Sequence, residues 1–218
     1  MLLKTFYALI FCWCITCLFL RCYMNLSGFE TGKTMGKGYG ELRTSYNWVS
    51  DSPIFWGSDE EFSNYEIRDY KTWDIRLKYG VHEKIDVGMK AGLLSGITVD
   101  TKVQLLGDFE SPFAIAAGFG AGLRENGVLE FPLYFSAHPS EYLSFYVTPR
   151  YIRQKRDLYK RAYGTDLFHF KGYNMGAFYG WEDIQIGIDY GRYWVSGGKR
   201  KVNTSTIGIS VKYLFSGD

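Results

Sequence analysis

Charged side chains recur at alternate positions through most of this chain, with apolar residues between them. In residues 85–93, Asp86 and Lys90 share one face with glycines, and the opposite face is apolar. Such a period of two is typical of a strand with one polar and one apolar face. Across the chain, mid-strand positions of this kind carry six acids and seven bases, which could neutralise one another if buried. We expect Glu41 and the following residues to form this network: Arg43, Asp74, Arg76, Lys78, Asp86, Lys90, Asp100, Lys102, Glu130, Arg150, Asp189 and Lys212.

Catalytic and metal-binding patterns are scarce in comparison. The chain has no Gly-x-Ser-x-Gly, His-Glu-x-x-His or phosphate-loop motif, and its three histidines lie far apart in the sequence. His169 follows Asp166 closely and is the one acid–histidine pair that could do acid–base chemistry. We expect no enzyme activity, no metal, no cofactor and, from a nearly neutral charge with dispersed bases, no nucleic acid.

The elements that position these charges are ten alternating segments after residue 35. Their length of roughly ten residues suits a tilted strand that crosses a bilayer. The sequence predicts an all-β, antiparallel up-and-down barrel of about ten strands, with eight or twelve as alternatives. The expected strands are about 41–49, 70–81, 85–93, 97–105, 113–123, 128–138, 142–153, 168–181, 184–194 and 204–215.

Which face of the barrel is apolar decides between a membrane protein and a soluble one. Glycines lie among the charges on the polar face, where they would make room for long side chains inside a narrow barrel. Aromatic residues gather toward both ends of the apolar face, as at two membrane interfaces. We therefore expect the polar face to line the lumen. A soluble lipocalin-like barrel, with its apolar face inward around a ligand, is the alternative.

Two observations test the ten-strand scheme. The connections after the second, fourth, sixth and eighth segments are short, whereas those after the first, seventh and ninth are long. Those after the third and fifth are also short, so the alternation is incomplete. Outer-membrane barrels likewise alternate short periplasmic turns with longer outer loops. Pro132 and Pro149 argue against clean closure, because proline lacks the donor that a ladder of strands needs.

The N-terminal segment has the features of an export signal. Residues 5–20 carry no charge and follow Lys4, and the run is shorter than a spanning helix requires. An uncleaved membrane anchor is the alternative. All four cysteines lie in or just after this run, so no disulfide framework is expected in the barrel. We divide the chain into a signal peptide or lipoprotein signal at 1–22, a periplasmic lead-in at 23–38 and a barrel at 39–216.

The last predicted strand resembles a family feature. Thr206, Gly208, Val211 and Tyr213 match the β-signal that the barrel assembly machinery reads in bacterial outer-membrane proteins. The chain is similar to small Gram-negative outer-membrane β-barrel proteins over roughly residues 36–215. The resemblance implies a location in the outer-membrane bilayer and insertion by that machinery. Cys22, or alternatively Cys17, occupies the place where a bacterial lipoprotein carries its lipid.

The expected role follows from the charges and the loops. We predict a structural or surface-interaction protein whose lumen is filled by charged side chains; a narrow small-solute channel is the alternative. An enzyme at the barrel rim is a further alternative, because omptin proteases and lipid A deacylases place acid–histidine groups there. Two basic loops could bind lipopolysaccharide phosphates. They contain Arg153, Lys155, Arg156, Lys160, Arg161, Lys199, Arg200 and Lys201.

Overall fold

The computed structural model describes residues 26, 28–53, 67–92, 96–108, 110–122, 127–155, 167–181, 183–197 and 202–216. Within them, the chain has no helix with the length and apolar character needed to span a membrane. The predicted signal segment, with Cys17 and Cys22, lies outside the described residues, as do six of the eight basic loop residues.

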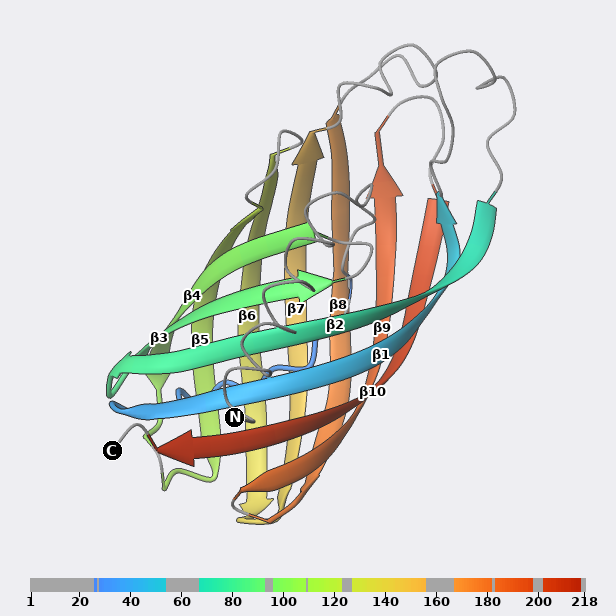
Figure 1. Ribbon diagram of the computed structural model, residues 1–218. Coiled ribbons are helices and arrows are strands. Elements are labelled where there is room, and N and C mark those ends of the chain that lie inside the picture. The colour runs from blue at the N-terminus through green and yellow to red at the C-terminus, as the bar shows by residue number, and fades with distance from the viewer. Residues whose placement is uncertain are drawn as a thin grey trace, which may run out of the picture.

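Ten antiparallel strands form one closed barrel in which each strand pairs with its neighbours in sequence, and the last pairs with the first. Figure 1 shows the strands as a tilted cylinder. The strands are β1 (Tyr39–Pro53), β2 (Ile67–His82), β3 (Ile85–Gly92), β4 (Gly96–Leu106), β5 (Phe113–Gly122), β6 (Val128–Ser140), β7 (Leu143–Lys155), β8 (Leu167–Gly180), β9 (Ile184–Ser196) and β10 (Val202–Ser216). The predicted fold class and the count of ten strands are confirmed.

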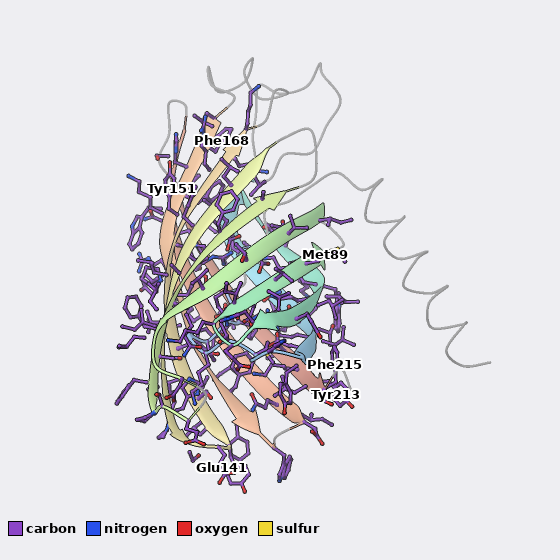
Figure 2. The ribbon with its side chains drawn as sticks, turned by 90° about the vertical axis from the view of Figure 1, so that its left-hand side faces the viewer. Met89, Glu141, Tyr151, Phe168, Tyr213 and Phe215 are labelled. Atoms are coloured by element: carbon purple, nitrogen blue, oxygen red, sulfur yellow. The ribbon has the colours of Figure 1, made fainter. Side chains whose placement is uncertain are left out.

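Alternate residues of each strand face the lumen and the outer surface of the barrel. On β9, for example, Ile188 is 61% exposed whereas its neighbour Asp189 is 4% exposed. Most large apolar residues of the strands face outward, and most of the residues buried within are charged or polar. Figure 2 shows Met89 and Tyr213 pointing away from the barrel wall. This polarity is the reverse of a soluble barrel, and it overturns the lipocalin-like alternative.

The two strand prolines do not interrupt closure. Pro132 pairs with Arg150 across β6 and β7, and pairing resumes at Phe135 and Val147 on the same register. Pro149 likewise holds its place opposite Tyr173 on β8. The argument against closure was therefore wrong, because the barrel accommodates each proline without shifting the strands.

Turns at one end of the barrel are short. Only two residues separate β2 from β3 and β6 from β7, whereas thirteen residues lie between β1 and β2. In the turn between β4 and β5, Asp108 accepts hydrogen bonds from the hydroxyl and the backbone N–H of Ser111, which lower the pKa of its carboxyl group. We call this the short-turn end and the opposite one the long-loop end.

The segment before β1 differs from the sequence-based expectation. Residues 23–38 were expected to be a lead-in on the periplasmic side, but Leu26, Phe29 and Glu30 are each at most 3% exposed. Their partners are inward-facing residues of the wall, so the described part of this segment lies within the lumen (Figure 1, blue). At the short-turn end the backbone N–H of Gly38 donates to the carbonyl of Gly80. We call residues 26–36 the lumen segment.

Candidate functional site: the lumen and the segment inside it

A single carboxylate joins the lumen segment to the charged wall. Glu30 lies 3.1 Å from Arg76 (Oε2 to Nη1) and 3.0 Å from Lys102 (Oε1 to Nζ), and it also pairs with the ammonium of Lys78. These cations lie on β2 and β4. Both strands pair with β3, one on each side, so their inward-facing residues are close together in the lumen. Buried charges of this kind are stable only when paired. Glu30 therefore satisfies three wall cations at once.

Backbone groups of the lumen segment also bond to wall side chains. The N–H of Gly32 donates to Ser136 Oγ at 2.9 Å, and the N–H of Met35 donates to Asp86 Oδ1 at 2.9 Å. Thr34 donates through its N–H to Gln104 Oε1 at 2.8 Å. A segment without regular structure has backbone groups that need partners when buried. Here the polar wall supplies the partners that a strand or helix would otherwise provide.

At the long-loop end the segment is held by its first described residue. The carbonyl oxygen of Leu26 accepts hydrogen bonds from Arg150 (3.1 Å), Asn174 (3.0 Å) and Tyr193 (3.1 Å). The Leu26 side chain packs into a buried apolar cluster with Val49, Ile152, Phe168, Phe170, Tyr193 and Val195. The sequence predicted a lumen filled by charge, but this end of it is apolar. Water and ions would meet hydrocarbon here before reaching the charged wall.

Phe29 anchors the middle of the segment against the wall. Its ring lies 6.3 Å from the ring of Phe178 on β8, and the guanidinium of Arg43 lies 5.8 Å from it. The ring fits because Gly208 of β10 faces it: a Cβ at this glycine would lie 2.9 Å from Phe29 Cζ and 2.2 Å from Asn47 Oδ1. The glycine thus makes room for a residue of the segment itself.

This close fit yields a packing prediction. We expect Gly208→Ala to lower the free energy of unfolding by about 1–3 kcal/mol, because the added methyl group must displace a buried ring and a buried amide. Urea unfolding of the purified protein in detergent, followed by tryptophan fluorescence, measures the change. Gly120→Ala is the matched control, since its Cβ would meet nothing closer than 3.5 Å. Equal effects at both positions would contradict the fit.

Besides the buried Glu41, the structure places the twelve other predicted network residues on the inward face. Ten are buried, and the side chains of Asp100 and Glu130 are 15% and 14% exposed. Several are paired: Arg76 with Asp100 at 2.6 Å, Lys102 with Asp86 at 3.1 Å, and Arg150 with Glu130 through Nε at 2.9 Å. Asp189 instead accepts hydrogen bonds from Tyr146 and Asn174, each at 2.7 Å. The remaining members are Arg43, Asp74, Lys78, Lys90 and Lys212.

Sequence reasoning missed Glu30, Phe29 and Leu26 because their segment has no strand periodicity. Two signals could have found it. The wall carries seven bases against six acids, and Glu30 supplies the seventh acid. Glycines recur at positions 28, 32 and 36, and a Cβ at Gly28 or Gly32 would lie within 2.5 Å of wall atoms. Small residues at a regular spacing in a non-repetitive segment indicate a chain that passes through a narrow space.

The other candidate sites lie apart from the lumen. His169 Nδ1 is 2.6 Å from the Tyr151 hydroxyl, and the two rings stack on the outward face of β7 and β8, away from any lumen group. Its suggested partner Asp166 lies outside the described residues. Arg153 and Lys155 are exposed near the long-loop end, but their expected partners in the two basic loops are not described. The four β-signal residues all lie on β10, with Val211 and Tyr213 exposed.

A shallow hollow of about 500 Å³ lies on the outer surface over β2 to β5. Its lining includes exposed apolar residues of the outer face: Leu77, Val87, Met89, Val99 and Phe119. Figure 2 shows Met89 on this side. An apolar exterior hollow on a membrane-facing surface fits lipid, so the lumen remains the candidate functional site.

The barrel and its surface together define a class of protein. All strands are paired, so no edge is left open, and the outer face is a continuous apolar belt with exposed aromatic residues such as Trp73 and Trp181. A bilayer provides no hydrogen-bond partners, and a closed barrel with an apolar exterior is one of two structures that can span it. The chain is therefore an integral membrane β-barrel of the outer-membrane type.

No family model and no curated protein matches the chain. Similar solved structures include the NanC porin, with 12% identity, 79% of this chain and 98% of that chain covered, and a TM-score of 0.47. An outer membrane channel from Pseudomonas putida F1 is 12% identical, with 88% of this chain and 100% of that chain covered and a TM-score of 0.46. Ail, the attachment invasion locus protein of Yersinia pestis, is 11% identical, with 82% of this chain and 99% of that chain covered and a TM-score of 0.38.

Proposed function

We propose that this chain is an outer-membrane barrel with a structural or surface-interaction role, and that its lumen segment closes it to solutes. The observation that carries the proposal is the Glu30 carboxylate, buried at 3% exposure among three wall cations. A side chain so deeply paired, on a segment bonded to strands on several sides of the barrel, supports a filled lumen. A filled barrel of this size offers rigidity and a surface rather than a conduit.

An enzymatic role has little support in this arrangement. His169 forms a hydrogen bond with Tyr151 on the outer face. The acids of the lumen lie on the other side of the barrel wall, so a substrate could not contact His169 and one of these acids together. His138 lies between the hydroxyls of Ser136 and Ser144, each at 2.8 Å, without a carboxylate partner in the described bonds. We therefore propose that the barrel acts through its surface. Catalysis would require that His169→Ala abolish a measurable turnover.

Two partners remain proposals. The β-signal residues lie on β10, the strand that closes the barrel against β1, which supports reading by the assembly machinery. Lipopolysaccharide is the second, supported by exposed Arg153 and Lys155 at the long-loop end. Arginine and lysine suit phosphate at a membrane surface. Unchanged lipopolysaccharide binding after replacement of both basic loops would remove that partner.

Fractionation and bilayer recording together test the proposed function. We expect the protein in the outer-membrane fraction, with a gel mobility that changes on boiling as a folded barrel unfolds. The same purified protein should give no steady current in a planar lipid bilayer, because the lumen segment occupies the path. Steady conductance of the wild-type protein would contradict a closed lumen. A soluble periplasmic species whose mobility is unaffected by boiling would contradict the membrane barrel.

A further inference from the structure

The three cations around Glu30 belong to the wall, whereas the carboxylate that they bind belongs to the lumen segment. We propose that Arg76, Lys78 and Lys102 form a carboxylate-binding site of the barrel, and that Glu30 is its built-in occupant. The ligand class is a small organic anion that carries a carboxylate. This inference rests on the proposed function, because it concerns what the closed lumen would bind once Glu30 is absent.

The wall organises this site independently of Glu30. Arg76 is held by Asp100 at 2.6 Å, through Nη2, which leaves Nη1 directed at Glu30. Lys102 is held by Asp86 at 3.1 Å. Both carboxylates come from the wall, so two of the three cations keep an acidic partner when Glu30 is removed. A site whose cations are already positioned loses less conformational entropy when it binds a ligand.

The charge balance at the site favours one negative charge. Arg76, Lys78 and Lys102 contribute three positive charges, and Asp86 and Asp100 contribute two negative ones. The cations are at most 7% exposed, so the surplus positive charge lies away from water. An uncompensated buried charge is strongly destabilising. One monovalent anion balances this charge, and the Glu30 side chain supplies it.

The geometry indicates a carboxylate in particular. The two oxygens of Glu30 are used separately: Oε2 faces the Arg76 guanidinium, and Oε1 faces the two lysine ammonium groups. A planar carboxylate presents its oxygens in this divided way, and an arginine with lysines provides matching donors. A single chloride ion could neutralise the charge but could not bridge both sets of donors.

Rescue by acetate tests the site. In full-length Glu30→Ala, purified in detergent, the thermal midpoint should rise with sodium acetate and saturate, whereas sodium chloride of equal ionic strength should raise it less. At an acetate concentration ten times its dissociation constant, the ratio of folded to unfolded protein should rise about tenfold. Wild-type protein should show no such difference between the salts, because Glu30 occupies the site.

Glu41→Ala is the matched control. This buried carboxylate lies opposite Lys78 in the register of β1 and β2, but among the described ion pairs it joins Arg43 at 3.4 Å and none of the three cations. It should not distinguish acetate from chloride. Glu30→Ala combined with Lys78→Gln should also lose the distinction. If Glu30→Ala folds only poorly, the folded fraction after refolding, read from the heat-dependent gel shift, should increase with acetate.

Several results would overturn the inference: equal responses of Glu30→Ala to the two salts, an acetate effect as large in Glu41→Ala, or one retained without Lys78. None of these bears on whether the wild-type lumen is closed, which bilayer recording decides. Conductance of the wild type would remove the proposed function while leaving the acetate result to be judged separately.

Discussion

Removing the lumen segment should turn a silent barrel into a conducting one. A chain that starts at Lys37, and therefore lacks residues 1–36, should give steady current steps in a planar bilayer after refolding in detergent. An eight-stranded barrel is just wide enough to be filled by its own side chains, and ten strands enclose more. In the full chain that additional space holds Leu26, Phe29, Glu30 and their neighbours. Without them, water can enter between the charged walls.

The comparison for this experiment is the full-length chain refolded in the same way, which should remain silent. A change of gel mobility on boiling must show that both proteins are folded. As a second variant, the full chain with residues 28–34 replaced by glycine and serine keeps the connection but loses the anchors. It should give intermittent current. Silence in both variants, with folded barrels, would mean that wall side chains alone close the lumen.

Arg150→Ala should be among the most destabilising single substitutions in the barrel, at about 3–5 kcal/mol. Arg150 is 5% exposed and bonds to Glu130, Asn174, Tyr193 and the Leu26 carbonyl. Its loss leaves a carboxylate deprived of its closest cation and frees the long-loop end of the lumen segment. The free energy of unfolding in urea, extrapolated to zero denaturant, measures the effect.

Arg153→Ala is the matched control for this prediction. Arg153 lies three residues further along β7, faces outward and is exposed. Its replacement should change stability by no more than about 0.5 kcal/mol. Arg150→Lys should fall between the two, because an ammonium keeps the charge but cannot spread donors over four partners. A loss at Arg150 no greater than at Arg153 would show that the network contributes little.

The barrel was predictable because the pattern that specifies each strand lies within a few neighbouring residues. Each strand needs only a period of two, and an alternation such as Ile184 to Asp189 specifies both its length and the direction of its faces. Ten such segments in succession, joined mostly by short connections, leave few topologies other than a meander. Pro132 led to a wrong argument against closure. It lacks a backbone N–H, but the residue pairs on both sides of it keep the same register, which the sequence alone does not show.

The lumen segment was not predictable in the same way, because its contacts are distant in sequence. The N–H of Gly28 donates to Asp189, 161 residues away, and the carbonyl of Leu26 accepts from Tyr193, 167 residues away. No local pattern reports such pairs. The wall charges lie on the inward face. The position of Glu30 among them depends on the path of a segment without repeating structure.

These distances also constrain how the protein is made. The lumen segment immediately precedes β1, yet its partners Asn174, Asp189 and Tyr193 lie on β8 and β9, among the last parts of the chain to emerge during synthesis. These bonds of the segment can therefore form only after almost the whole chain has been made. After β1 and β10 have joined, entry would require drawing a polypeptide between glycines that leave no room for a methyl group. We expect the strands to assemble around the segment, so that the barrel closes with its lumen already occupied.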